Sequence, residues 1–258
     1  MSYRFYYSSV KGTSHEKTNT PKQDNLSVQC CVVNDVEYLI SSVADGAGTA
    51  KHSDISSNFI CRFLNKRMIE WLQTNEISNF NQDVMYAWIR KFQTIINRFI
   101  KIYKLSSIRD FATTILFAAL SNKGNIFVQI GDGAISVGNS AELNCVFHPQ
   151  KGEYANTTHF ATEEKFENNL MFKFVSENIE RVAMHTDGIE MISLVNLETP
   201  SLAFFNPFFD CLVDEPNGYN EELSQELSEF LNSERVNKRT NDDKTLVIIT
   251  KLECDGKV

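Results

Sequence analysis

The chain has 258 residues, of which 42% are apolar and 22% charged, a composition typical of a globular protein with a sizeable core. Its net charge of −8 at pH 7 lacks the basic excess that proteins binding nucleic-acid backbones usually carry. No apolar run reaches the length of a membrane span, and the polar, aromatic first residues do not resemble a secretion signal. We therefore expect a cytoplasmic protein that binds neither nucleic acid nor a membrane.

Short runs of apolar and β-favouring residues predict strands along the chain. They lie at 26–33, 37–44, 113–120, 125–130, 134–138, 142–147, 182–185 and 245–252. Asn34-Asp35 separates the first two runs and is good turn chemistry, and Asn122-Lys123-Gly124 separates the next two. Both pairs of runs are therefore expected to form hairpins.

Helices are expected between and after these strands. Apolar side chains recur at helical spacing from 55 to 68, behind Ser53 as the predicted N-cap, and again from about 83 to 103. A polar helix with leucines on one face is expected at 221–231. The first two helices are predicted to cover one face of a sheet.

Two segments lack a clear period. The aromatic stretch at 204–209, which contains Pro207, is predicted to be irregular. We expect its aromatic side chains to fill the core beneath a loop. The alternative is that they form a substrate-docking patch on the surface. The polar region at 152–169 is expected to form a surface flap.

The cysteines give no sign of a reactive thiol, because none forms a Cys-x-x-Cys pair and no local signature points to a nucleophile. They are Cys30, Cys31, Cys61, Cys145, Cys211 and Cys254. In a cytoplasmic protein we expect them to be reduced and mostly buried as small apolar side chains.

The most informative feature is the position of aspartates at the ends of β-like runs. These residues are Asp24, Asp45, Asp132, Asp187 and Asp242. Glycine follows three of them directly and lets the backbone turn sharply near a ligand, although a single Asp-Gly is more often an ordinary turn. Several carboxylates gathered at one rim of a sheet repel one another, and a divalent cation compensates that repulsion.

The ligand chemistry of such a rim narrows the choice of metal. Oxygen ligands without a cluster of histidine and cysteine favour Mg²⁺ or Mn²⁺ over Zn²⁺. Two such ions ~4 Å apart can clamp a phosphoryl group and activate a water. The aspartates therefore favour metal-dependent phosphoryl chemistry.

Six short motifs, in order, resemble those of the protein phosphatase 2C family of metal-dependent phosphatases. They are Pro21-Lys22-Gln23-Asp24-Asn25, Val43-Ala44-Asp45-Gly46-Ala47-Gly48, Ala112-Thr113-Thr114, Ile130-Gly131-Asp132-Gly133, His185-Thr186-Asp187-Gly188-Ile189 and Asn241-Asp242-Asp243-Lys244-Thr245. Each motif is weak alone, whereas six in the family's order, over nearly the whole chain, are strong. The compact Asp-Gly-Ala-Gly resembles a divergent bacterial branch of the family most closely.

The resemblance implies a fold, a reaction and partners. The fold is an α+β, four-layer α/β/β/α sandwich of two mainly antiparallel sheets flanked by helix pairs, with residues 1–258 as a single catalytic domain. The reaction is hydrolysis of phosphoserine and phosphothreonine in proteins by water that two Mg²⁺ or Mn²⁺ ions activate. The implied partners are a phosphorylated protein and a cognate serine/threonine kinase, and the oligomeric state stays open.

The resemblance also assigns site residues. The expected catalytic carboxylates and metal ligands are Asp24, Asp45, Asp187 and Asp242. Gly46 would add its carbonyl oxygen, and Asp110 is a candidate ligand for a third ion, with a solvated loop residue as the alternative. Asp132 is expected to cap a turn near the site, and Asp243 to support the ligands from behind.

The chain departs from the eukaryotic members where they bind phosphate and donate a proton. No arginine lies at 18–20, and Ala47 stands where those enzymes have a histidine. The candidate phosphate-binding residues are Lys22 and Lys51, and the candidate proton donors are His15 and His185. Solvated surface charges and structural hydrogen bonding are the respective alternatives.

Two other functions fit parts of the sequence. A pseudophosphatase would use the same fold as a regulatory binding module, but loss of metal aspartates would favour it, and Asp45, Asp187 and Asp242 are all present. A metal-dependent nuclease or nucleotide hydrolase is disfavoured by the lack of a basic excess and by the order of the motifs.

Overall fold

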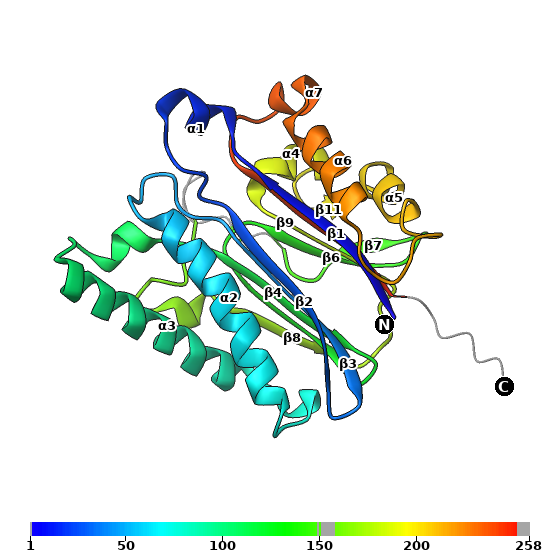
Figure 1. Ribbon diagram of the computed structural model, residues 1–258, viewed down its shortest axis with the longest axis horizontal. Coiled ribbons are helices and arrows are strands. Elements are labelled where there is room, and N and C mark those ends of the chain that lie inside the picture. The colour runs from blue at the N-terminus through cyan, green and yellow to red at the C-terminus, as the bar shows by residue number, and fades with distance from the viewer. Residues whose placement is uncertain (1, 149, 151–157, 252–258) are drawn as a thin grey trace. The chain divides into compact units, whose positions relative to one another are not determined.

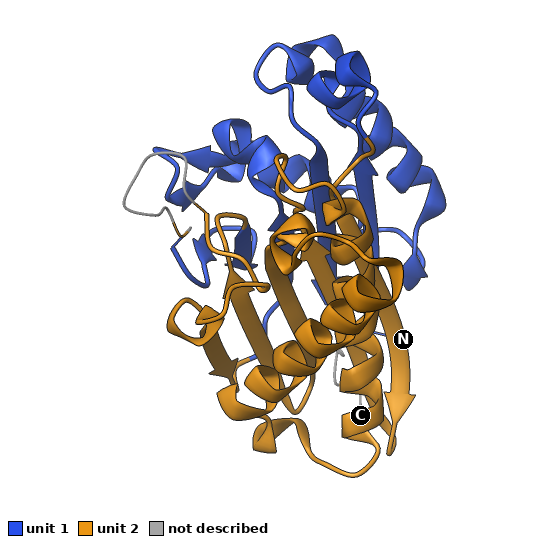
Figure 2. Ribbon diagram, turned by 90° about the vertical axis from the view of Figure 1, so that its left-hand side faces the viewer, with its two compact units in different colours: residues 1–20, 134–148, 178–258 blue, residues 21–133, 149–177 orange. Residues whose placement is uncertain are grey.

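The computed structural model describes residues 2–148, 150 and 158–251. The chain divides into two compact units (Figure 2). Unit 1 comprises residues 1–20, 134–148 and 178–258, and unit 2 comprises residues 21–133 and 149–177. Each unit is therefore assembled from segments that are far apart in the sequence.

Unit 2 contains a five-stranded sheet in the order β2-β3-β4-β5-β8, in which every neighbouring pair is antiparallel. Its strands are β2 (Asn25–Val33), β3 (Val36–Ala44), β4 (Ile115–Ser121), β5 (Gly124–Ile130) and β8 (Met171–Val175). The predicted first hairpin is confirmed, because Asn34 and Asp35 take left-handed φ values of 51° and 61° and form a two-residue turn. The edge strand β8 was not predicted.

Two long helices of unit 2, α2 (Ser53–Leu72) and α3 (Gln82–Tyr103), lie on the same face of this sheet (Figure 1). Fully buried side chains such as Leu64, Phe92 and Phe117 form the core between the helices and the strands. The short helices η1 (Ile77–Asn79), η2 (Ile108–Phe111) and η3 (Phe166–Asn168) complete the unit. Both predicted long helices are thus confirmed.

The start of α2 differs from the prediction. His52 occupies the N-cap position and Ser53 is the first helical residue. The Ser53 hydroxyl is directed to the preceding loop, where it donates to the carbonyls of Ala47 and Ala50, each at 3.1 Å. Ser53 was wrongly predicted as the cap because its hydroxyl closes the loop after Asp45 instead.

Unit 1 contains a six-stranded sheet in the order β12-β1-β13-β9-β6-β7. Its strands are β1 (Tyr3–Val10), β6 (Ala134–Gly138), β7 (Leu143–Cys145), β9 (Arg181–His185), β12 (Gly218–Tyr219) and β13 (Lys244–Lys251). The pair β1–β12 is parallel and the other neighbours are antiparallel. The central strand β13 begins within the predicted metal motif at 241–245.

The helices of unit 1 are mostly short. They are α1 (Thr13–Thr18), η4 (Asp187–Ile189), α4 (Glu190–Ser193), α5 (Leu202–Asp210), α6 (Glu221–Asn232) and α7 (Glu234–Asn237), and a small ladder pairs β10 (Leu194–Val195) with β11 (Thr199–Pro200). Helix α6 packs on β1 and α5 on β13 (Figure 1). The core between them includes Tyr6, Phe205, Phe209, Leu227 and Ile248.

The aromatic stretch at 204–209 is helical, so its predicted irregularity was wrong. Helix α5 contains Pro207 and is capped by the Ser201 side chain, which accepts from the Phe204 N–H at 3.3 Å. Phe205 and Phe209 are fully buried one helical turn apart, and this burial outweighs the helix-breaking tendency of the proline. The core role is confirmed for these two phenylalanines.

The predicted α+β class is confirmed. Each unit consists of a mainly antiparallel sheet with helices packed on it, as each half of the expected sandwich requires. The predicted flap at 152–169 falls outside the described residues as far as 157. In its described part, Ala161 and Phe166 are fully buried in the core of unit 2, so this part is anchored. The single catalytic domain stays a prediction.

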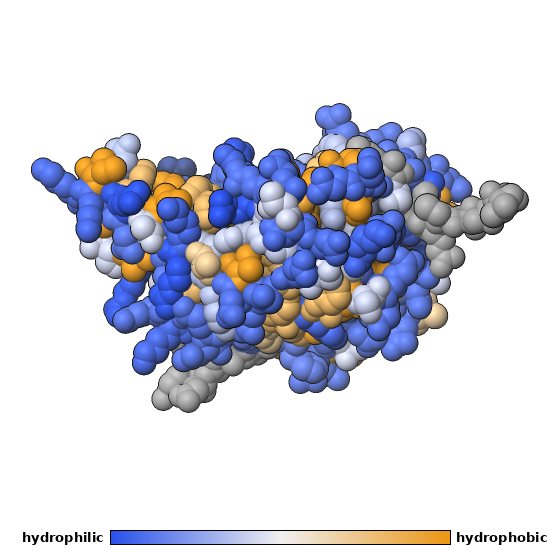
Figure 3. Space-filling view, turned by 90° about the horizontal axis from the view of Figure 1, so that it is seen from below, coloured by the Kyte–Doolittle hydropathy of each residue, from blue (hydrophilic) through white to orange (hydrophobic). Residues whose placement is uncertain are grey.

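The described surface and cysteines agree only partly with expectation. Among the described residues, no helix is both long and apolar enough to cross a membrane. The face shown in Figure 3 is mainly hydrophilic, with hydrophobic residues in separate places.

All five described cysteines are free, but only Cys61 of these is buried, so the prediction of mostly buried cysteines was wrong. Complete or partial loss of hydration raises the pKa of each of these thiols, which argues against a nucleophilic role.

Candidate metal and phosphate site

Asp45 follows the last residue of β3, and two threonines hold its backbone in place. Its N–H donates to Thr114 Oγ1 at 2.9 Å, and its carbonyl accepts from the Thr114 N–H at 2.8 Å. The Thr113 hydroxyl donates to the same carbonyl at 3.1 Å. The paired threonines before β4 therefore fix the backbone that carries the Asp45 carboxylate.

Gly46 brings the first two motifs into contact. Its N–H donates to the Gln23 carbonyl at 3.2 Å. A Cβ at position 46 would lie 2.7 Å from the Ser53 Cβ and 2.9 Å from the Gln23 carbonyl oxygen, so no side chain fits there. Asp24, the next residue after Gln23, is 1% exposed. The predicted ligands Asp24 and Asp45 thus lie on backbone segments that touch each other.

Asp132 lies at the end of β5, in a turn that needs the left-handed φ of 109° at Gly131. One of its carboxylate oxygens lies within 4.8 Å of a carboxylate oxygen of Asp45, and both side chains are half-buried. The Thr158 hydroxyl donates to the Asp132 carboxylate. Two carboxylates this close repel, and a divalent cation is the usual compensation. Asp132 can therefore act as a metal ligand, in addition to the predicted role of capping a turn.

The other predicted residues of unit 2 are Asp24, Asp110, Lys22 and Lys51. Among the described residues, Asp24 and Asp110 belong to no group of three or more acidic, histidine or cysteine side chains close enough to share an ion. Asp110 lies in η2, half-buried, and its carbonyl accepts from the His52 N–H at 2.8 Å. Lys22 is half-buried and Lys51 is exposed, two residues before the start of α2.

In unit 1, the Asp187 turn packs against the segment that follows Asp242. A Cβ at Gly188 would lie 1.8 Å from the Asp243 carbonyl oxygen, so the turn requires glycine there. The Thr186 N–H donates to the Thr245 carbonyl at 3.3 Å, and the Thr245 N–H donates to Thr186 Oγ1 at 3.2 Å. The two closing motifs of the sequence therefore form one locally connected structure.

Asp242 and Asp243 have different surroundings. Asp242 is exposed, and its carboxylate accepts from the Asp243 N–H at 2.8 Å. The Asp243 carboxylate is 3% exposed, accepts from the Gly12 N–H at 2.7 Å and lies 3.0 Å from His15 Nδ1. Asp243 thus ties the segment at 12–15 to the start of β13, which is a supporting role, while Asp242 keeps an accessible carboxylate.

His185 is fully buried, and both ring nitrogens are engaged. Nδ1 donates to the Thr186 carbonyl at 2.9 Å, because a carbonyl can only accept, and Nε2 then accepts from the Ser193 hydroxyl at 3.1 Å. Burial lowers the His185 pKa to about 4, so the ring is neutral at pH 7. These contacts favour the structural alternative for His185, and the Asp243 contact does the same for His15.

A family model described as protein phosphatase 2C matches residues 11–232. The chain belongs to the protein phosphatase 2C family. It is also 34% identical over 252 residues to serine/threonine-protein phosphatase 3 of Escherichia coli strain K12, a match that covers 96% of this chain and 98% of that protein. The family and the class of enzyme predicted from the sequence are both confirmed.

Solved structures of bacterial phosphatases share the fold at low sequence identity. A bacterial serine phosphatase is 15% identical, with a TM-score of 0.64 and coverage of 100% of both chains. A serine/threonine phosphatase from Staphylococcus aureus is 15% identical, with a TM-score of 0.58 and coverage of 96% of this chain and 95% of that one. Similarity at 15% identity establishes the fold. It does not establish the role of any individual site residue in this chain.

Proposed function

We propose that the protein hydrolyses phosphoserine and phosphothreonine in proteins at a site where Asp45, Asp132 and Asp187 hold Mg²⁺ or Mn²⁺. The observation that carries the proposal is the half-buried pair Asp45 and Asp132, whose carboxylate oxygens approach within 4.8 Å. Asp187, on the corresponding turn after a strand in unit 1, would be the third carboxylate. A donor set made only of oxygens fits Mg²⁺ and Mn²⁺ better than Zn²⁺.

The other predicted ligands complete the proposed site. Asp24 and the Gly46 carbonyl would bind metal next to Asp45, and Asp242 next to Asp187. We propose Asp132 in preference to Asp110 as a further metal ligand, because a carboxylate oxygen of Asp132 lies within 4.8 Å of one of Asp45 and Asp110 belongs to no such group of described residues. When bound, two ions would neutralise charge on the phosphoryl group and make water a better nucleophile.

Residues of the chain would position the metal-binding carboxylate and the substrate phosphate for the reaction. The threonine pair at 113–114 holds Asp45 so that its carboxylate does not have to reorganise during turnover. Lys51, and to a lesser extent Lys22, would attract the substrate phosphate. The products are inorganic phosphate and the free serine or threonine hydroxyl, without a phosphoenzyme.

The wider biological setting is also part of the proposal. The substrate would be a phosphorylated protein in the cytoplasm, and a cognate serine/threonine kinase would supply it. Residues 1–258 would act as a single catalytic domain with two bound ions.

Phosphate release from an aryl phosphate and from a phosphothreonine peptide tests this function. We expect hydrolysis with Mn²⁺ or Mg²⁺, loss of activity in EDTA, and recovery when Mn²⁺ is added back in excess. Full activity in chelator, with no metal in the purified protein, would refute the metal-dependent reaction. Binding of the phosphopeptide without turnover at any metal concentration would instead support the pseudophosphatase.

A further inference from the structure

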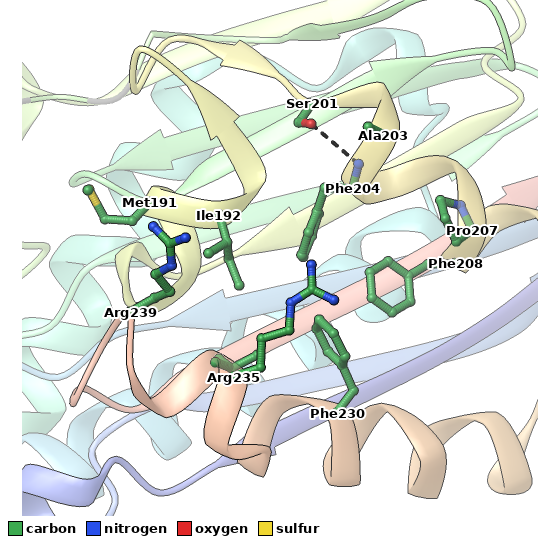
Figure 4. A pocket seen from close by; sticks show the side chains of 11 residues that line it. Met191, Ile192, Ser201, Ala203, Phe204, Pro207, Phe208, Phe230, Arg235 and Arg239 are labelled. Carbon is green, nitrogen blue, oxygen red and sulfur yellow. Dashed lines mark hydrogen bonds between the residues drawn. The ribbon is translucent and has the colours of Figure 1, made fainter.

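Unit 1 contains an apolar pocket of about 630 Å³ that includes none of the proposed metal or phosphate ligands (Figure 4). Its walls come from α4, α5, α6 and the segment that begins with α7. The lining residues are Met191, Ile192, Ser201, Ala203, Phe204, Pro207, Phe208, Phe230, Arg235, Val236 and Arg239. Most of them are apolar, so the pocket suits an apolar group.

Three phenylalanine rings form one side of the pocket. Phe204 and Phe208 of α5 and Phe230 of α6 have ring centroids 5.2, 5.3 and 6.2 Å apart, and all three side chains are only half-buried. The same helix α5 buries Phe205 and Phe209 completely. Helix α5 therefore places Phe205 and Phe209 inside the core, while Phe204 and Phe208 pack against the edge of that core and also line the pocket.

Two arginines also line the pocket: Arg235 lies near the rings, and Arg239 lies near Met191 and Ile192 (Figure 4). Arg235 and Arg239 are both exposed, and among the described residues neither guanidinium has an ion pair or hydrogen bond. The nearby Lys238, by contrast, pairs with Glu234 at 2.7 Å. The chain as a whole is acidic, with a net charge of −8, but Arg235 and Arg239 give the pocket a local positive charge that attracts anions.

We propose that this pocket docks a short acidic peptide segment of a partner protein. An apolar side chain of the segment enters beside Phe204, Phe208 and Phe230, and carboxylates flanking it pair with Arg235 and Arg239. Arginine suits this role because its planar guanidinium binds carboxylates through two parallel hydrogen bonds.

The lining favours a peptide over a small aromatic anion such as a nucleotide. Apart from the two arginines, the polar side chain in the lining is Ser201, whose oxygen already accepts from the Phe204 N–H. Few groups therefore remain to recognise the edge of a base, whereas an apolar side chain needs none. This docking role goes beyond the proposed reaction, because it concerns how a partner is recruited and not how phosphate is removed.

Fluorescence anisotropy with a labelled synthetic peptide of about twelve residues tests the proposal. The probe carries one phenylalanine flanked by aspartates and glutamates, with two comparison peptides in which the phenylalanine is alanine or the acids are amides. We expect saturable binding with a Kd on the order of 10 μM, weakened by salt, and about tenfold or more weaker binding of both comparison peptides.

Matched variants locate the binding. Arg235→Glu should weaken binding of the acidic peptide about tenfold or more. Lys238→Glu makes the same charge change three residues away, outside the lining, and should leave binding nearly unchanged. Hydrolysis of a small aryl phosphate should be the same in both variants as in the wild type, since neither residue belongs to the proposed metal site.

Three results would overturn the docking site. They are no saturable binding up to about 1 mM peptide, equal binding of the amide peptide, and an Arg235→Glu variant that binds as well as the wild type or no worse than Lys238→Glu. Failure of the proposed phosphatase reaction would be seen separately, as an absence of phosphate release by the wild type, and would not alter the anisotropy.

Discussion

Asp45 and Thr114 hold each other by a reciprocal pair of hydrogen bonds. The Asp45 N–H donates to the Thr114 hydroxyl oxygen at 2.9 Å, and the Thr114 N–H donates to the Asp45 carbonyl at 2.8 Å. Thr114 immediately precedes β4, so the position of Asp45 is set by the sheet and not by the loop that follows it. This pair explains why two threonines accompany the aspartate motif.

Replacing Thr114 by valine should therefore weaken both the fold and the site. The variant keeps the shape of the side chain but removes the acceptor for the Asp45 N–H, which should lower the free energy of unfolding by about 1–3 kcal/mol. Mn²⁺ affinity should also fall, because the carboxylate is held less firmly. Urea unfolding and calorimetric Mn²⁺ titration measure the two effects. Thr114→Ser, which retains the hydroxyl, is the control, and equal behaviour of both variants would show that the hydrogen bond is unimportant.

The sequence predicted elements where local chemistry and packing agree. Asn34-Asp35 favours a two-residue turn, and the structure pairs Val33 with Val36 across it. The helix expected at about 83–103 spans Gln82–Tyr103, with Asn81 as its cap. In both cases the local sequence preference for a turn or a helix agrees with the structure that the fold requires at that position.

Predictions failed where tertiary contacts decide the structure. The edge strand Met171–Val175 has no fully buried residue, so its sequence shows little apolar periodicity. The helix at Leu202–Asp210 forms despite Pro207 because Phe205 and Phe209 are buried. The sequence led us to expect that strand-end aspartates gather, but it did not say which of them lie closest to Asp45, since that depends on how the sheet orders β3, β4 and β5. The one signal in the sequence was the Asp-Gly that both share.

Asp132 and Asp110 offer a direct comparison of two candidate ligands. Asp132→Asn should weaken Mn²⁺ binding and lower kcat about tenfold or more, because it removes a carboxylate close to Asp45. Asp110→Asn should leave both quantities close to those of the wild type. Parallel metal titrations and steady-state kinetics measure the difference. If the order were reversed, Asp110 would regain the role that the resemblance first assigned to it.

Gly188 tests the contact between the two closing motifs. In Gly188→Ala, the added Cβ would lie 1.8 Å from the Asp243 carbonyl oxygen, so the Asp187 turn or the start of β13 must move. We expect a loss of about 1–3 kcal/mol in the free energy of unfolding, measured by urea denaturation. Activity in the remaining folded protein should also fall. Gly48→Ala is a suitable control, because a Cβ at position 48 would lie 4.0 Å from its nearest neighbouring atom. A Gly188→Ala variant as stable as that control would mean that the contact is easily relieved.

Lys51 tests how this chain holds the substrate phosphate without the arginine of eukaryotic relatives. It is exposed and lies just before α2, whose free N–H groups also favour anions. Lys51→Ala should lower kcat/KM for a phosphothreonine peptide roughly ten- to a hundredfold, the cost of one charge-assisted contact. Metal affinity should not change, because no proposed ligand is altered. Unchanged kcat/KM would make Lys51 an ordinary solvated charge, and an equal loss of metal affinity would indicate a disturbed loop.

The turnover of Asp45→Asn and Asp187→Asn at saturating Mn²⁺, measured with a phosphothreonine peptide, tests most directly whether these carboxylates form the reaction centre. Both residues follow strands and are half-buried, so replacement by an amide of the same shape should leave the fold intact. We predict that kcat falls by several orders of magnitude in each variant while circular dichroism and the melting temperature stay close to those of the wild type. Near-normal turnover of either variant at saturating metal would contradict the assignment of that aspartate.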